Sequence, residues 1–160
     1  MPPRPIYVQP GDMVLTEEPS ILQTVLGSCV GITFQATGKG IAALCHPMLP
    51  CQTSRGTDEG SSGSDGRFVD SAIREVGRIL DAKGVERPHV VVKVFGGSDV
   101  LPFSKATGRP TVGHLNAVAA RQALSQEGFV VAAERLGGTR GLHLTFDTVT
   151  GEVLIRRLKG

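Results

Sequence analysis

The sequence has little net charge and no long apolar run. Seventeen basic and 15 acidic side chains give a formal charge of +2, too small an excess to bind nucleic acid without other contacts. No stretch approaches the roughly 20 apolar residues of a membrane span. The first ten residues also lack the basic segment and apolar run of a signal peptide. We therefore expect neither nucleic-acid binding nor membrane insertion.

Cysteine is scarce: only Cys29, Cys45 and Cys51 are present. A small, odd number argues against a disulfide scaffold and favours a reducing compartment, so we expect free thiols and a cytoplasmic location. Cys45, His46 and Cys51 are close enough in sequence to be considered as soft metal ligands. They contain no C-x-x-C pair and no fourth ligand is evident, so the sequence predicts no metal site.

Glycine and proline are abundant, with 21 and 10 among 160 residues, which indicates many turns and short elements. The length suits a single domain over residues 1–160. Within it, residues 1–10 are predicted to be a loosely ordered N-terminal segment. Residues 52–66 contain almost nothing apolar and are predicted to form a mobile loop.

Apolar periodicity predicts two helices among several strands. The clearer helix starts near Arg67 and stops at Gly84, and a weaker one covers 115–124. Strand-like apolar segments occupy 13–15, 21–26, 30–34, 41–44, 89–95, 129–133, 142–146 and 153–158. This order favours a layered α+β domain over a regularly alternating βαβ fold.

Cys29 and His46 are candidates for nucleophilic chemistry. Gly27 and Ser28 precede Cys29, and such small residues leave the sulfur approachable and let nearby backbone amides point at a developing oxyanion. His46 follows 17 positions later, after a strand, a turn and a second strand, so an antiparallel return would bring both side chains to one sheet edge. An imidazole there could hold the thiol proton and lower the thiol pKa from about 8.5. A buried structural cysteine and a structural histidine remain the alternative.

Other patterns are less specific. Gly96-Gly97 and Gly137-Gly138 complete no phosphate-binding motif and are interpreted as turns. Glu134 with Arg135, and the basic residues of 156–159, are interpreted as solvated faces that could help to dock a protein partner.

Five strings follow one another in a specific order along the chain. They are Leu26-Gly27-Ser28-Cys29-Val30, His46-Pro47-Met48-Leu49-Pro50, Arg67-Phe68-Val69-Asp70, Lys93-Val94-Phe95-Gly96-Gly97 and Gly137-Gly138-Thr139-Arg140-Gly141. A closing segment contains Thr150-Gly151-Glu152 and Arg156-Arg157-Leu158. Together these strings resemble the CheD family of chemoreceptor glutamine deamidases, and the similarity extends over nearly the whole chain from about Gly11.

The resemblance implies a hydrolase that converts receptor glutamines to glutamates, often also removes methyl esters, and needs no cofactor. It implies an α+β fold, a layered αββα sandwich with mixed, largely antiparallel sheets similar to the catalytic domain of cytotoxic necrotizing factor toxins. It also implies two partners, namely the cytoplasmic helices of chemoreceptors as substrate and the CheC phosphatase as regulator.

The resemblance also assigns roles to residues. The nucleophile is carried over to Cys29 and the base to His46, while the oxyanion is expected at the backbone of Ser28 and Cys29. In the family a hydroxyl residue, often six positions before the cysteine, orients the histidine. Gln23 stands at that position, so we assign the role to Thr24, with Gln23 as the alternative. A shift of one residue turns a strand side chain to the opposite face, so the two assignments exclude each other.

Two further residues depart from the family pattern. Cys45 stands where asparagine or alanine is common, and it is expected to place a second thiol near the site. Leu115 replaces an arginine beside the retained Asn116 and is expected to alter docking of the receptor or partner. Two other functions stay open. One is a binding module that regulates CheC with weak or no catalysis, and the other is a cysteine hydrolase acting on a different amide or a small molecule.

Overall fold

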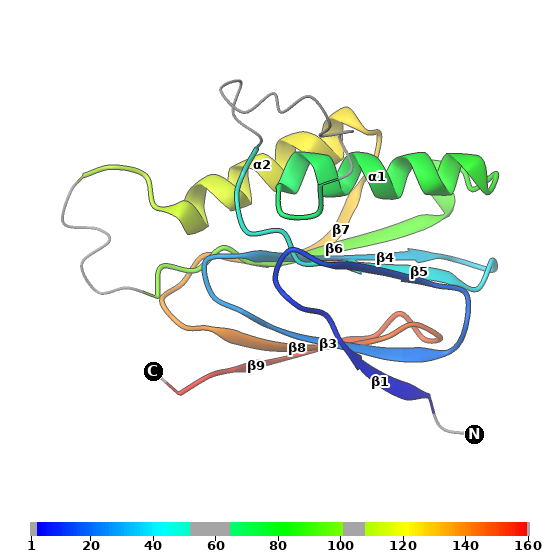
Figure 1. Cartoon of the computed structure of the whole chain (residues 1–160), viewed down its shortest axis with the longest axis horizontal. Coiled ribbons are helices and arrows are strands. Elements are labelled where there is room, and N and C mark those ends of the chain that lie inside the picture. The colour runs from blue at the N-terminus through cyan, green and yellow to red at the C-terminus, as the bar shows by residue number, and fades with distance from the viewer. Residues whose placement is uncertain (1–2, 52–64, 101–107, 160) are drawn as a thin grey trace.

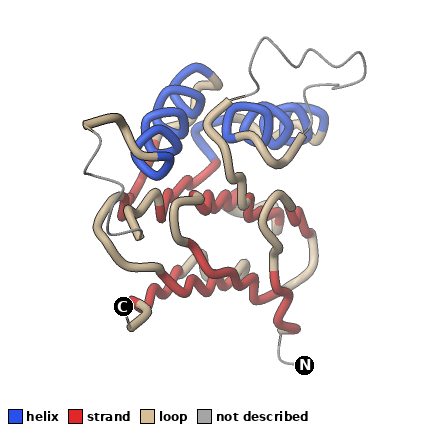
Figure 2. Tube along the Cα trace, turned by 60° about the vertical axis from the view of Figure 1, so that its left-hand side comes forward, coloured by secondary structure: helices blue, strands red, loops and turns tan. Residues whose placement is uncertain are grey.

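Two β-sheets stack face to face, and two helices cover the outer face of one of them (Figure 1 and Figure 2). The computed structural model describes residues 3–51, 65–100 and 108–159. Helix α1 spans Val69–Ala82, helix α2 spans Val112–Gln126, and a short 3-10 turn, η2, spans Arg87–His89. Both long helices pack on the same sheet, so the described layers run helices, sheet, sheet.

The sheet under the helices has five strands in the order β2-β5-β4-β6-β7. Its partner has four strands in the order β1-β3-β8-β9. Neighbouring strands are antiparallel except for the pairs β1/β3 and β6/β7. The bounds are β1 Arg4–Tyr7, β2 Met13–Thr16, β3 Ser20–Leu26, β4 Val30–Ala36, β5 Ile41–Cys45, β6 Val90–Gly96, β7 Val131–Leu136, β8 Leu142–Asp147 and β9 Val153–Arg157.

Two apolar cores explain this layering. One lies between the helices and the five-stranded sheet, where α1 buries the face carrying Val69, Ile73, Val76 and Leu80. The chain leaves α1 at Gly84, whose φ of +73° favours glycine. The second core lies between the sheets. Strands β4 and β5 therefore have buried side chains on both faces.

The second core is built by strands of both sheets. It contains Val8, Leu22, Leu26, Ala42, Leu44, Phe95, Leu142, Leu144 and Phe146.

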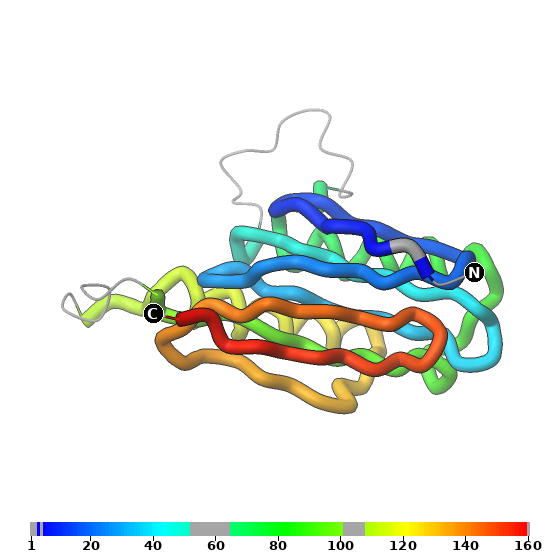
Figure 3. The backbone as a smooth tube through the Cα atoms, turned by 90° about the horizontal axis from the view of Figure 1, so that it is seen from below, coloured from blue at the N-terminus to red at the C-terminus, as the bar shows by residue number. Residues whose placement is uncertain are grey.

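The α+β class, both helices and the predicted strands are confirmed. The described helices form one layer, whereas the resemblance implies a helical layer on each side of the sheets. Residues 4–7 form β1 against β3 rather than a loose segment, because without them the edge of β3 would be unpaired (Figure 3). The loop predicted at 52–66 lies outside the described residues apart from its last two. No helix in the described ranges is long and apolar enough to cross a membrane.

Candidate active site

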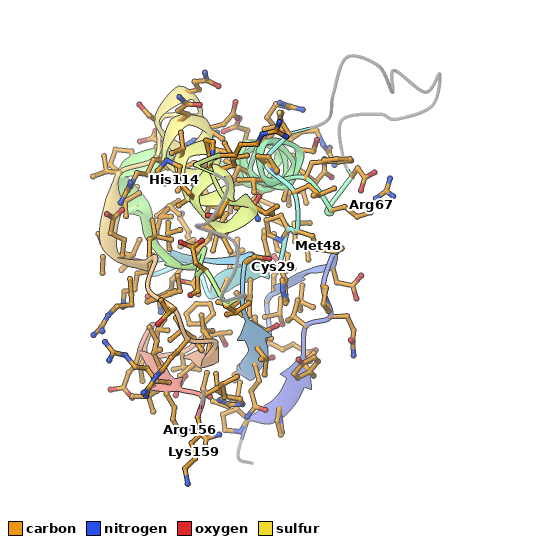
Figure 4. All side chains as sticks on the ribbon, turned by 90° about the vertical axis from the view of Figure 1, so that its left-hand side faces the viewer. Cys29, Met48, Arg67, His114, Arg156 and Lys159 are labelled. Atoms are coloured by element: carbon orange, nitrogen blue, oxygen red, sulfur yellow. The ribbon has the colours of Figure 1, made fainter. Side chains whose placement is uncertain are left out.

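The turn between β3 and β4 carries Cys29 at one end of the sandwich (Figure 4). The three backbone carbonyl groups of this turn accept hydrogen bonds from neighbouring segments. Gly27 accepts from Ser98 N at 2.9 Å and Cys29 accepts from Gly97 N at 2.9 Å. Ser28 accepts from Asn116 Nδ2, also at 2.9 Å. The side chain of Cys29 stays partly exposed and packs against the core between the sheets.

This carbonyl pattern sets the direction of the amides. In a trans peptide the N–H points away from the preceding C=O, so the Ser28 and Cys29 amides point away from the groups that hold Gly27 and Ser28. Within the described residues, neither amide donates to a backbone carbonyl. In the described part of the chain both donors are therefore left without a carbonyl acceptor, as the donors of an oxyanion site must be before substrate binds.

His46 follows β5 and is almost fully buried, with 1% of its surface exposed. Its backbone is fixed on both sides: His46 N donates to Asp12 O at 3.0 Å, and Gly11 N donates to His46 O at 2.7 Å. The segment before β2 therefore holds the histidine in place, although it is more than 30 residues away in sequence.

Thr24 determines which ring nitrogen of His46 carries hydrogen. Thr24 Oγ1 lies 2.6 Å from His46 Nδ1 and donates to Val8 O at 2.7 Å. A hydroxyl has a single hydrogen, so an oxygen that donates to Val8 must accept from the ring. Nδ1 is then the protonated nitrogen, and Nε2 of the neutral ring has a free lone pair. Thr24 is fully buried. Gln23 is only partly buried and its position on β3 turns it to the opposite face.

Strand register brings Cys29 and His46 to one face. Ile32 pairs with Cys45 across β4 and β5, and Val30 N donates to Pro47 O at 3.3 Å, so extension of this register by three residues places Cys29 opposite Met48. His46 is two positions from Met48, so Cys29 and His46 are diagonal neighbours, about 7–8 Å apart at the backbone. Among the described residues, the ring hydrogen-bonds to Thr24 and Val8, and none of its bonds reaches Cys29 Sγ. Contacts of catalytic groups are often this loose before substrate binds.

Burial decides the resting charges of both groups. Desolvation raises the pKa of Cys29, and the hydrogen bond from its own amide opposes this only in part. Desolvation lowers the pKa of His46, against smaller upward effects of Val8 O and Asp12. The resting pair is therefore a neutral thiol and a neutral imidazole. The sequence-based expectation of a lowered thiol pKa is wrong for this state, because burial acts on Cys29 and no charged imidazolium offsets it.

Asn116 joins the two halves of the site. Its side chain is fully buried on α2, and Nδ2 donates to Ser28 O and to Met48 O, each at 2.9 Å. Oδ1 is buried without a partner in the described part of the molecule. The amide thus ties the turn before Cys29 to the segment after His46. Sequence reasoning assigned it no role, and its only signal was that it keeps the residue of the family pattern beside the departing Leu115.

Two glycines allow the close packing on which these contacts depend. A Cβ at Gly96 would collide with the carbonyl of Cys29, and a Cβ at Gly113 would lie 2.5 Å from Ser98 O. Gly96 also has a φ of +100°. The Gly96-Gly97 turn, interpreted from sequence as a simple turn, thus supports Cys29. Gly113 lets the start of α2 approach the sheet closely enough for Asn116 to reach it.

The other two thiols lie away from this face. Cys45 directly precedes His46, and successive side chains of a strand point to opposite faces. The side chain of Cys45 therefore points into the core beneath the helices, where burial strongly raises its pKa. The expectation of a second thiol near the site is therefore wrong. The same alternation separates Cys45 from His46 as potential metal ligands. Cys51 is exposed. Leu115 is also exposed, and it lines a groove between α1 and α2 rather than the Cys29 turn.

Comparison with known proteins decides the family. A family model described as CheD, chemotactic sensory transduction, matches residues 48–157. A Geobacter sulfurreducens protein named as probable chemoreceptor glutamine deamidase CheD 2 is 40% identical over 153 residues, which cover 96% of this chain and 89% of that protein. This chain belongs to the CheD family. The model match begins after Cys29 and His46, whereas the relative's alignment covers nearly the whole chain.

Further CheD relatives come from distant organisms. Proteins named as probable chemoreceptor glutamine deamidase CheD are 34% identical in Oleidesulfovibrio alaskensis and 35% identical in Methanococcus vannielii. The matches cover 96% and 95% of this chain, and 72% and 94% of those proteins.

Two solved structures are also similar to this CheD chain. They are Bacillus licheniformis YfiH, at 13% identity, and Geobacillus stearothermophilus YlmD, at 15%, each with a TM-score of 0.49. The matches cover 78% and 79% of this chain, which spans about half the length of each, 49% and 50%.

Proposed function

We propose that this protein deamidates glutamine side chains on the cytoplasmic helices of bacterial chemoreceptors, converting them to glutamates with release of ammonia. The observation that carries the proposal is the Thr24–His46 hydrogen bond on the sheet face that Cys29 shares. The names of the CheD relatives supply the substrate class. The three free thiols of the chain suit a reducing cytoplasm.

In the first half-reaction, Cys29 Sγ attacks the carboxamide carbon and its proton passes to His46 Nε2. The Ser28 and Cys29 amides stabilise the negative oxygen that forms. Thr24 keeps the ring in the tautomer whose Nε2 can accept, and it favours the imidazolium because its oxygen already accepts the Nδ1 hydrogen. His46 then gives the proton to the departing nitrogen, so that ammonia leaves and a thioester remains.

In the second half-reaction, water attacks the thioester carbon and loses a proton to His46 Nε2. The carbon–sulfur bond breaks, the thiolate recovers the proton, and the product is a glutamate side chain. Because both groups rest neutral, His46 acts as a true base in each half-reaction. A methyl ester would enter the same thioester with methanol as leaving group, so methylesterase activity belongs to the same proposal.

The test measures ammonia release from purified receptor cytoplasmic fragments, together with mass spectrometry of the modified glutamines. Cys29→Ala should abolish release and leave the thermal unfolding midpoint close to wild type, since this side chain is only partly buried. Cys45→Ala is the matched control, because that thiol faces the opposite layer and its loss should leave the rate per folded molecule unchanged. Activity retained by Cys29→Ala would refute the nucleophile.

The CheC phosphatase belongs to the proposal as a regulatory partner on the strength of the resemblance. A binding module that acts only through CheC would bind this partner and release no ammonia. Wild-type protein and Cys29→Ala should both bind CheC, whereas only wild type should release ammonia from receptor fragments. Binding without ammonia release by the wild type would instead favour the binding-module function.

A further inference from the structure

A basic pocket opens at the same end of the sandwich as Cys29. It has a volume of about 360 Å³ and contains three exposed arginines. In Figure 4, which views this end, Arg156 and Lys159 of the C-terminal segment lie below Cys29. The lining residues are Arg135, Leu136, Gly137, Gly138, Thr139, Arg140, Leu142 and Arg157.

Strand pairing explains why two of these arginines converge. Strands β7 and β9 are terminal strands of the two stacked sheets. Arg135 pairs with Phe95 on β6, and Arg157 pairs with Leu142 on β8. Phe95 and Leu142 both belong to the core between the sheets. Directly paired residues share a sheet face, so Arg135 and Arg157 point into the edge of the gap between the sheets.

The charge of this pocket is not balanced from within. No acidic residue lines it, and in the described part of the chain Arg135, Arg140 and Arg157 form no ion pair with a carboxylate. On the helices and the η2 turn, by contrast, Arg74, Arg78, Arg87 and Arg121 each pair with an acidic side chain. Guanidinium groups bind carboxylates through paired hydrogen bonds, so three unpaired guanidinium groups around one pocket favour an anionic ligand.

The pocket adjoins the Cys29 turn directly. Its floor residue Leu142 pairs with Leu26, three positions before Cys29. Ser98 connects the two features, because its amide donates to Gly27 O at 2.9 Å and its hydroxyl donates to Gly137 O at 2.9 Å. Because Gly27, Ser28 and Cys29 form a turn, the three residues from Leu26 to Cys29 span at most about 10 Å. On a helix that distance corresponds to no more than about two turns.

We propose that this pocket binds an acidic side chain of the substrate helix, within about two turns of the target glutamine, and so helps to select which glutamine is deamidated. The proposal rests on the proposed function for the identity of the substrate. An open pocket with exposed guanidinium groups suits a side chain presented by a protein surface, whereas a free anion would be held more tightly by an enclosed site.

The test uses helical receptor peptides and the Cys29→Ala protein, so that binding is measured without turnover. The peptides carry glutamate or glutamine three, four or seven residues before or after the target, positions on the same face of the helix. Arg157→Gln should weaken binding of the better glutamate peptide by about three- to tenfold and leave the glutamine peptide unaffected. Arg156→Gln is the matched control, because it removes the same charge from the neighbouring residue on the opposite face of β9.

A charge-reversal variant and a lysine peptide test for direct contact between Arg157 and the flanking residue of the peptide. Arg157→Glu should reverse the preference, so that a peptide with lysine at the flanking position binds better than one with glutamate. In protein that keeps Cys29, the Arg157→Gln change should raise KM for the glutamate peptide and leave kcat unchanged. Equal effects of Arg157→Gln and Arg156→Gln, or equal binding of glutamate and glutamine peptides, would overturn the pocket assignment.

The pocket assignment and the deamidase function can be refuted independently of each other. If wild type releases ammonia but shows no flanking preference, the pocket assignment falls and the deamidase function stands. If wild type releases no ammonia, yet the Arg157-dependent preference for acidic peptides persists, the deamidase function falls and the acidic-helix site stands.

Discussion

Thr24 Oγ1 and His46 Nδ1 lie 2.6 Å apart in the buried space between the two sheets. The threonine hydroxyl also donates to Val8 O, so the three groups form a chain that runs from a backbone carbonyl to the imidazole. A side chain from β3 thereby fixes the tautomer of a histidine that follows β5. Substitutions of Thr24 should therefore act through the orientation of the histidine, whereas substitutions of Cys29 act on the thiol itself.

Thr24→Val should lower kcat by at least about tenfold, a part of the 10²–10⁴ that a positioned base contributes, because Nδ1 loses its nearer acceptor and keeps only Val8 O, 3.4 Å away, to orient the ring. KM should change little, since Thr24 is buried away from substrate. Thr24→Ser keeps the oxygen and should retain most of the activity. Steady-state kinetics of ammonia release measure both variants, and equal losses in serine and valine would show that only packing matters at this position.

The raised pKa of Cys29 predicts slow, pH-dependent alkylation. The rate with iodoacetamide should increase about tenfold per pH unit through neutrality, with a midpoint above about 8.5, because burial disfavours the thiolate. A Cys51→Ser background removes the exposed thiol, while Cys45 is buried. Mass spectrometry of the Cys29 peptide gives the rate. A midpoint below about 7 would instead indicate a resting thiolate–imidazolium pair.

The lowered pKa of His46 predicts loss of stability in acid. The unfolded chain, with an ordinary histidine pKa of about 6.5, takes up a proton before the folded protein does. The free energy of unfolding should therefore fall as the pH drops below about 6.5, and this group should have no effect at higher pH. Urea unfolding across that range measures the slope. His46→Gln should reduce it, whereas His89→Gln, at an exposed histidine, should leave it as in wild type.

Asn116→Asp should impair both folding stability and catalysis. The change replaces an amide donor with a carboxylate, so the carbonyls of Ser28 and Met48 lose their hydrogen bonds and face negative charge. Each buried carbonyl left unpaired costs about 1–3 kcal/mol, and kcat should fall more than KM rises because the Cys29 turn loses its support. Chemical denaturation and kinetics test this.

Gln122→Glu is the control for Asn116→Asp, since it makes the same chemical change at an exposed position of the same helix. It should leave both stability and activity near wild type. If Asn116→Asp matched it in both measurements, the amide would not hold the turn.

Both helices and the strands other than β1 could be predicted because each follows from local pattern. The apolar spacing from Val69 to Leu80 predicts α1, and the strand–turn–strand unit predicted between Cys29 and His46 is present as β4 and β5. Strand β1 was missed because Arg4–Tyr7 has no strong pattern and owes its structure to pairing with β3. Helix α2 begins three residues earlier than predicted, where Thr111 Oγ1 accepts from His114 N.

The sequence by itself determined which residues could do chemistry and where the chain turns, because side-chain type, spacing and glycine placement are local properties. Only the tertiary structure decided that Thr24 rather than Gln23 faces His46, that Cys45 faces the opposite layer, and that Asn116 spans the site. The physical reason is that strand pairing across distant segments sets which face each side chain occupies. Burial then sets its charge, and neither is encoded within a short stretch of chain.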